Sequence, residues 1–140
     1  MVLWSALNKQ LPLRKSNTAK LNFGAARFSK GKLAEVIARV YLRQHGYRCV
    51  AANFRNRAGE IDLILEHPAH RAIVFVEVKY RSHAGFGGAS YAITQKQLRR
   101  IQNSAGQFMA RHPRLQDHAV RFDAILFHGS LWQLEWIQGL

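Results

Sequence analysis

Cysteine is almost absent from the sequence, since Cys49 is the single one in 140 residues. An internal disulfide is therefore excluded, and so is a metal site built from several thiolates. A single cysteine is compatible with a reducing compartment, and we expect a cytoplasmic protein. Because Cys49 lies in the apolar stretch 47–52, we also expect a buried and unreactive thiol.

Long apolar runs and acidic residues are scarce as well. No run approaches the ~20 apolar residues needed to cross a bilayer, and no basic amphipathic segment carries the exposed aromatic residues typical of membrane binding. The chain has 8 Asp and Glu against 21 Lys and Arg, a net charge of +13. Such a basic surface attracts polyanions, which favours a nucleic acid over a membrane as the partner.

The first 34 residues contain no acid at all. We interpret residues 1–28 as a flexible basic N-terminal arm and residues 29–140 as one folded domain. The length fits a single domain, and 48% hydrophobic residues are enough to bury a core.

Hydrophobic periodicity predicts two helices and five strands. The helices are predicted over 32–45 and from Thr94 to the residues before Pro113, where Thr94 and Gln97 fit a capping box. The strands are predicted over 47–52, 60–65, 72–80, 120–127 and 131–137, with Asn53 in the turn after the first. The order α-β-β-β-α-β-β predicts an α/β fold with a mixed β-sheet flanked by α-helices.

Three charged residues on two neighbouring strands carry the chemical signal. Glu77 and Lys79 are two apart on a strand and therefore share a face, while Asp62 lies among aliphatic residues on the strand before. If the two strands form a hairpin, Asp62 and Glu77 lie side by side and can hold a hard cation such as Mg²⁺ or Mn²⁺. The structural alternative is that Glu77 pairs with Lys79 and that Asp62 pairs with an arginine.

The sequence also resembles a known family in a set of motifs. The motifs are Gly31 with Glu35, the segments 53–55, 59–64 and 74–81, Thr94 with Lys96, Arg99 with Arg100, and the segment 121–123. Together they look like the YraN family, also called UPF0102, over about residues 29–127. That family is similar to the restriction-endonuclease-like PD-(D/E)xK superfamily, especially to archaeal Holliday-junction resolvases. The resemblance implies a restriction-endonuclease-like core and a nuclease-like domain over residues 29–140.

The resemblance also assigns roles to single residues. Asp62 and Glu77 match the metal ligands, Lys79 matches the lysine of the motif, and Glu35 matches the helical glutamate that completes the site and is a third metal ligand. Two positions depart from the superfamily pattern. Ile61 occupies the place of the proline before the aspartate, and Tyr80 follows the lysine where threonine is more usual.

The resulting hypothesis is a metal-dependent endonuclease that hydrolyses phosphodiester bonds in DNA, with branched DNA and recombination intermediates among its substrates. In this hypothesis Asp62, Glu77 and Glu35 hold Mg²⁺ or Mn²⁺, and Lys79 steadies the attacking water or the developing charge. The candidate nucleic-acid contacts are Lys96, Arg99 and Arg100, near a predicted helix N-terminus, and Arg81.

Two other functions stay open. A non-catalytic nucleic-acid-binding or assembly protein can keep the same fold. Whichever function holds, the structural alternative for Lys96, Arg99 and Arg100 is a solvated basic face. A surface that contacts the ribosome would prefer RNA. A two-fold dimer would suit cleavage of two strands, although no residue demonstrates one.

Overall fold

The computed structural model describes residues 29–82 and 93–140, so the predicted N-terminal arm lies outside the described residues. The elements are α2 (Lys30–Gln44), β1 (Arg48–Asn56), β2 (Gly59–His67), the 3₁₀ turn η1 (Pro68–His70), β3 (Ala72–Arg81), α3 (Gln95–Ala110), the 3₁₀ turn η3 (Pro113–Leu115), β4 (Ala119–His128) and β5 (Leu134–Gln138). The predicted order α-β-β-β-α-β-β is confirmed. None of the helices in this part of the chain is long and apolar enough to cross a membrane.

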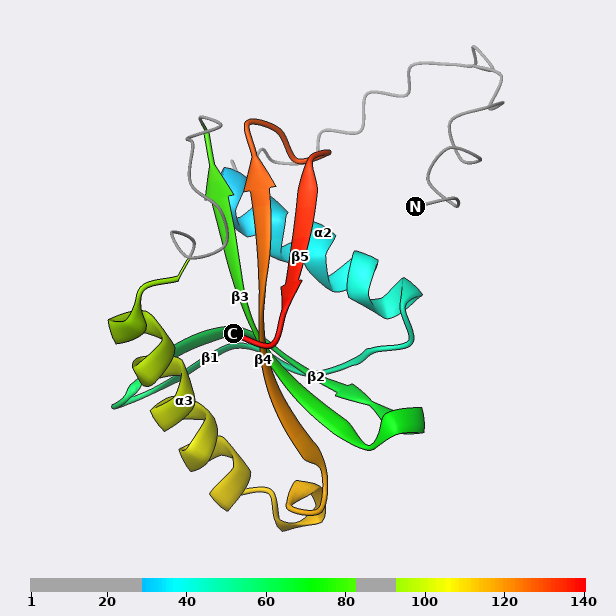
Figure 1. The fold of residues 1–140 in the computed structure, drawn as a ribbon, viewed down its shortest axis with the longest axis vertical. Coiled ribbons are helices and arrows are strands. Elements are labelled where there is room, and N and C mark those ends of the chain that lie inside the picture. The colour runs from blue at the N-terminus through cyan, green and yellow to red at the C-terminus, as the bar shows by residue number, and fades with distance from the viewer. Residues whose placement is uncertain (1–28, 83–92) are drawn as a thin grey trace, which may run out of the picture.

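The five strands form one mixed sheet in the order β1-β2-β3-β4-β5. Neighbouring strands are antiparallel except for β3 and β4, which are parallel because the chain crosses over through α3 between them. Figure 1 shows α2 and α3 on opposite faces of the sheet. The predicted α/β fold, a mixed sheet flanked by helices, is thereby confirmed.

Each helix buries one stripe against its own face of the sheet. On α2 the stripe is Ala34, Ala38 and Leu42, which packs with alternate residues of β2 and β3. On α3 the stripe is Ile101, Ala105 and Phe108, which packs with Ile61 and Ile64 of β2 and with Ile73 and Phe75 of β3. The predicted capping box is present: Thr94 Oγ1 accepts the Gln97 N–H, and the Gln97 side chain accepts the Thr94 N–H.

Strand β1 is longer than predicted and includes Asn53. It pairs with β2 as far as Asn56 and Gly59, so only two residues form the hairpin turn. The side chain of Asn56 stabilises this turn, because its Oδ1 accepts the N–H groups of Ala58 and Gly59 at 2.9 and 3.1 Å. The last strand, β5, begins at Leu134 rather than at residue 131.

The expectation of a buried Cys49 is wrong. The residue lies on β1, which is an edge strand of the sheet, and its side chain is exposed. Desolvation nevertheless raises the pKa of the Cys49 thiol, which keeps the thiolate population low. An apolar run predicts a strand, but it does not tell whether that strand lies at the centre or at the edge of a sheet.

The β1–β2 hairpin is fixed to α3 at its turn. Asn56 Nδ2 donates to the Ser104 carbonyl at 3.2 Å, and the buried Ser104 hydroxyl donates back to Asn56 Oδ1 at 3.0 Å. Gly59 lies so close to Arg100 that an added Cβ would be 3.4 Å from the Arg100 Cβ. The exposed start of α3 is therefore held beside the tip of the hairpin.

Candidate active site

Asp62 lies at the point where β2 and β3 stop pairing. The last paired residues are Leu63 and Val76, so the same register continued by one step would place Asp62 opposite Glu77. Instead, Oδ2 of Asp62 accepts the backbone N–H of Val78 at 2.7 Å. Figure 1 shows the upper part of β3 continuing upward while the β1–β2 hairpin turns away toward α3. The largely buried carboxylate of Asp62 thus bonds to the backbone of β3 just beyond the last strand pair.

The neighbouring strand bends at the same level. Asn53 stands opposite Asp62, between the pairs Ala52–Leu63 and Phe54–Ile61, and its φ of 51° is left-handed. Asparagine tolerates this conformation better than most residues other than glycine. A left-handed residue breaks the alternation of faces along a strand.

The two sides of this bend face different helices. Ala52 and Leu63 line a hollow next to α2, whereas Phe54 and Ile61 pack with the cluster of α3. Asn53 also lines the hollow next to α2. The bend therefore turns the Asn53 side chain toward α2.

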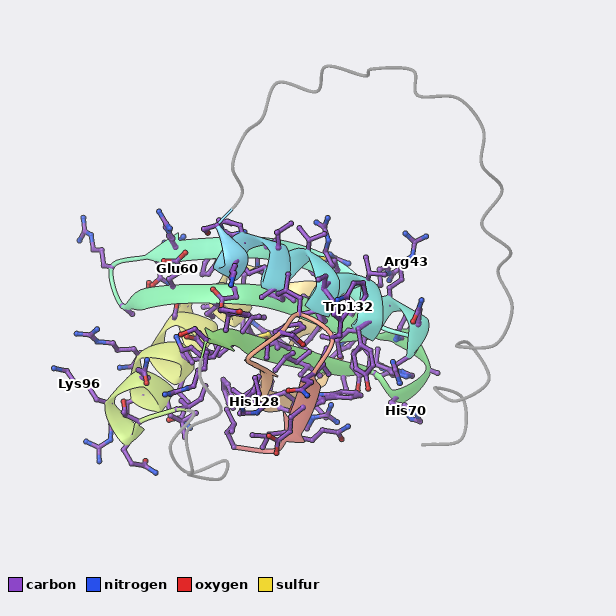
Figure 2. All side chains as sticks on the ribbon, turned by 90° about the horizontal axis from the view of Figure 1, so that it is seen from above. Arg43, Glu60, His70, Lys96, His128 and Trp132 are labelled. Carbon is purple, nitrogen blue, oxygen red and sulfur yellow. The ribbon has the colours of Figure 1, made fainter. Side chains whose placement is uncertain are left out.

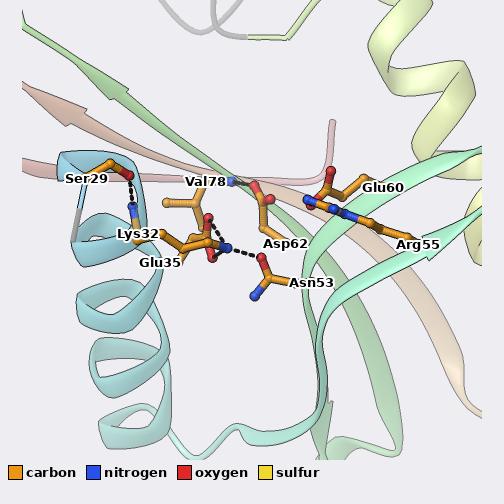
Figure 3. Close-up of polar contacts among 8 residues, drawn as sticks. All are labelled: Ser29, Lys32, Glu35, Asn53, Arg55, Glu60, Asp62 and Val78. Atoms are coloured by element: carbon orange, nitrogen blue, oxygen red, sulfur yellow. Dashed lines mark hydrogen bonds and ion pairs between the residues drawn. The ribbon is translucent and has the colours of Figure 1, made fainter. Parts of the chain in front are cut away.

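Glu35 approaches the same place from α2. It lines the hollow together with Asn53, and its side chain is 17% exposed. Lys32, one turn earlier, donates to both carboxylate oxygens of Glu35, at 2.9 and 3.3 Å, and to Oδ1 of Asn53. Figure 3 shows Lys32 and Glu35 reaching from α2 toward Asn53 and Asp62. A helix and an edge strand are thus joined at the level of Asp62.

The remaining two predicted residues lie on β3. Glu77 and Lys79 form an ion pair, with side chains 12% and 32% exposed. This part of the structural alternative is confirmed. Its other part is wrong, because the hydrogen bond that Asp62 accepts comes from the backbone of Val78 rather than from an arginine of the described residues.

We call Glu35, Asp62 and Glu77 the carboxylate cluster, because their charges act on one another. The pKa of Asp62 is raised from the ordinary 3.8 to about 7. Burial is the largest cause, followed by the charge of Glu77, and the charge of Glu35 adds to both. The Val78 N–H and the Lys79 ammonium oppose the rise. Burial and the neighbouring carboxylates thus make the charged form of Asp62 costly, and a carboxylate perturbed in this way is typical of functional sites.

The donor set of the cluster fits a hard divalent cation, since all its donors are carboxylate oxygens. In the described residues, however, no three acidic, histidine or cysteine side chains converge closely enough to hold a metal. Glu35 is directed to Lys32, and Glu77 is directed to Lys79. A cation site on these residues requires both glutamates to leave their lysines, and the metal assignment stays a prediction.

The predicted nucleic-acid contacts on α3 lie at the same end of the molecule as the hairpin turn, whereas Arg81 lies beside His128 where β3 and β4 end. Lys96, Arg99 and Arg100 are exposed on the first turns of α3, and Arg81 is exposed at the end of β3. In Figure 2, Lys96 and Glu60 mark this end, whereas Arg43 and His70 mark the opposite one. The hairpin adds Arg57 at its turn, so both sides of this end carry cations.

Sequence reasoning missed Lys32 and gave no role to Asn53, although Asn53 belongs to a family motif. Lys32 and Asn53 contact each other over 21 positions of sequence, which no local pattern reveals. Arg55, part of a family motif, pairs with Glu60 across the hairpin at 2.8 Å. The only available signal for Lys32 was its spacing of three residues before Glu35 on a helix.

Comparison with known proteins gives the family of the chain. The family model described as "Uncharacterised protein family UPF0102" matches residues 34–127. The chain belongs to the UPF0102 family. A UPF0102 protein of Halorhodospira halophila is 38% identical over 109 residues, which cover 78% of this chain and 84% of the relative.

Two further UPF0102 relatives agree with this assignment. One from Xanthomonas campestris pv. campestris is 39% identical over 114 residues, covering 81% of this chain and 92% of the relative. One from Shewanella frigidimarina is 42% identical over 111 residues, covering 79% of this chain and 97% of the relative. The resemblance noted from the motifs is confirmed. The matched range of the family model includes the carboxylate cluster and Lys79, whereas Lys32 precedes it.

Proposed function

We propose that this UPF0102 protein is a divalent-cation-dependent endonuclease that hydrolyses phosphodiester bonds in DNA. The observation that supports this most is Asp62, a largely buried carboxylate just beyond the last pair of β2 and β3, with two more carboxylates acting on its charge. A buried carboxylate with a strongly raised pKa costs stability, and in a protein of net charge +13 such a residue is a candidate functional group.

In this proposal each residue has a distinct task. Asp62 and Glu77 hold the cation, and Glu35 completes its ligands or orients a water. When bound, Mg²⁺ or Mn²⁺ supplies a Lewis acid and a water of lowered pKa. Lys79 is released from Glu77 and donates to the attacking water or to the developing phosphorane charge.

The basic end of the molecule supplies the substrate contacts. Lys96, Arg99 and Arg100 on α3 and Arg57 at the hairpin turn lie on two elements that touch at Gly59 and Arg100. Cations on two touching elements suit a polyanion whose phosphates lie along this end. We propose that DNA, branched DNA included, binds along this end, with its phosphates on these cations.

A second candidate function is supported by a different observation. Lys32 and Lys79 already neutralise Glu35 and Glu77 without any added cation. A non-catalytic nucleic-acid-binding protein could use these ion pairs as permanent structure. Such a protein would bind DNA with strong salt dependence and would never cleave it.

The deciding experiment is a cleavage assay on labelled single-stranded, duplex, flapped and four-way DNA with Mg²⁺ or Mn²⁺. Asp62→Asn is expected to lose cleavage and to keep DNA binding. Glu60→Gln is the matched control, because Glu60 lies two residues away on the same strand and pairs with Arg55 at the surface. Binding without cleavage in the wild type, or equal cleavage by wild type and Asp62→Asn, would overturn the proposal in favour of the second function.

A further inference from the structure

Lys32 has more partners than an ordinary surface lysine. Its ammonium carries three donors, and the structure directs them to both oxygens of Glu35 and to the amide oxygen of Asn53. The Lys32 side chain is 48% exposed, while the Glu35 side chain beneath it is 17% exposed. The ammonium therefore lies on the solvent side of the carboxylate cluster, where a substrate would arrive.

Asn53 is the unusual member of this contact. A residue other than glycine with a left-handed backbone inside a strand is uncommon and costs conformational energy. The same backbone turns the Asn53 side chain toward α2, where it meets Lys32 at the level of Asp62. A pair formed only by Lys32 and Glu35, three apart on one helix, would need no such residue.

The three partners respond differently to a cation. Glu35 is charged, so a divalent cation held at Asp62 would attract its carboxylate away from Lys32. Asn53 is neutral and belongs to another element, so it would stay in place and keep one donor of Lys32. The ammonium would then remain beside the carboxylate cluster with two donors free and its charge no longer neutralised.

We propose that Lys32 is a second lysine of the active site, which pairs with Glu35 in the absence of a cation and contacts a substrate phosphate when Glu35 turns to the cation. Asn53 is the positioning residue that retains Lys32 during this exchange. The inference rests on the proposed function, because it assigns a cation to the carboxylate cluster. It makes Lys32 both a competitor of the cation and a ligand of the DNA.

The test is Lys32→Met, with two readouts that do not depend on cleavage. Titration calorimetry with Mn²⁺ alone is expected to show about two- to five-fold tighter binding, since an exposed ion pair no longer competes for Glu35. Binding of a duplex in the presence of Ca²⁺, used as a cation without turnover, is expected to weaken. The slope of log affinity against log salt should fall by about 0.9, the loss of one phosphate contact.

Two variants separate this role from a structural one. Arg43→Met removes the same charge at the far end of α2, and both readouts should stay at the wild-type values. Asn53→Gly keeps the left-handed backbone and removes the amide, so the salt slope should fall while Mn²⁺ affinity stays unchanged. Opposite changes in cation and DNA affinity in Lys32→Met, together with these controls, would establish the exchange.

Other outcomes overturn the inference in distinguishable ways. Lys32→Met with wild-type Mn²⁺ and DNA affinities would show a plain surface ion pair. Weaker binding of both, with a lower melting temperature, would show a structural role. If the wild type binds no Mn²⁺ at all, the proposed function fails and this inference with it. If the wild type binds Mn²⁺ and Asp62→Asn does not, the cation site of the proposed function stands. A failure of the Lys32→Met predictions then overturns the role of Lys32 alone.

Discussion

Two aspartates of this sheet have opposite surroundings. Asp123, on β4, is fully buried and accepts four hydrogen bonds, from Arg121 Nε and Nη2, Trp136 Nε1 and the Gly139 N–H, at 2.8–3.1 Å. Asp62, on β2, accepts one backbone N–H, and two carboxylates and the Lys79 ammonium are its charged neighbours. One carboxylate has all its lone pairs satisfied by the fold, and the other does not.

The charges around each residue show what the difference means. Asp123 raises the pKa of the Arg121 guanidinium, and Arg121 also donates to the Tyr47 hydroxyl at 2.9 Å. That network joins β4 and β5 to the start of β1 and needs no ligand. At Asp62, burial and the charges of Glu77 and Glu35 raise the pKa of the aspartate itself, so an added proton or cation would stabilise the fold there. A buried carboxylate is structural when its partners are complete, and it indicates a binding site when they are missing.

The largest expected effect comes from breaking the complete network. Asp123→Asn leaves the guanidinium of Arg121 without its charged partner in a partly buried place. We expect the free energy of unfolding to fall by about 3 kcal/mol, as for other disrupted buried ion pairs. Urea denaturation of Asp123→Asn and Asp62→Asn measures the free energy of unfolding of each variant. A decrease in Asp62→Asn as large as that in Asp123→Asn would contradict the comparison.

A smaller effect is expected from pH, and its sign follows from the raised pKa of Asp62. The folded state favours protonated Asp62, so its contribution to stability is complete below about pH 4 and is lost as the pH rises through about 7. The asparagine of Asp62→Asn cannot ionise, so the variant keeps its stability as the pH rises through this range. Between these pH limits, the free energy of unfolding of the variant should rise relative to that of the wild type by on the order of 1–3 kcal/mol. Denaturation curves that run parallel across this pH range would argue against a crowded carboxylate.

The smallest effect is expected from adding a cation. If Mg²⁺ or Mn²⁺ binds with a dissociation constant of about 1 mM, about 10 mM of it stabilises the folded state by about 1.4 kcal/mol. The melting temperature of the wild type should then rise by about 3–5 °C. Asp62→Asn should show no rise, and Glu60→Gln, which alters an exposed carboxylate, should respond as the wild type does. An equal rise in all three proteins would show that the ion acts elsewhere.

Much of the fold could be predicted because its elements follow simple periodicities. The stripe of Ile101, Ala105 and Phe108 and the capping box of Thr94 are local patterns, and both are present. Asn53 was predicted in a turn because a polar residue after an apolar run usually ends a strand. Cys49 was predicted to be buried because it lies in an apolar stretch. That prediction is wrong because the stretch forms an edge strand, and strand order in the sheet is a property of the tertiary structure.

The candidate site could be predicted only in part, for a similar reason. The ion pair of Glu77 and Lys79 follows from their spacing on a strand, and the structure contains it. The contact of Lys32 with Asn53 depends on how α2 lies against the edge strand, which is set by the packing of the helix and by one left-handed residue. The metal and the DNA contacts stay predictions.

The hydrogen bond between Asp62 and Val78 has a practical consequence. The amide proton of Val78 points at the carboxylate on which the proposed chemistry depends, at an N···O distance of 2.7 Å. Its nuclear magnetic resonance signal should therefore shift whenever that carboxylate gains a proton or a metal ion, and its exchange with deuterium should quicken if the carboxylate turns away. A single backbone resonance thus reports the state of the site without any substrate.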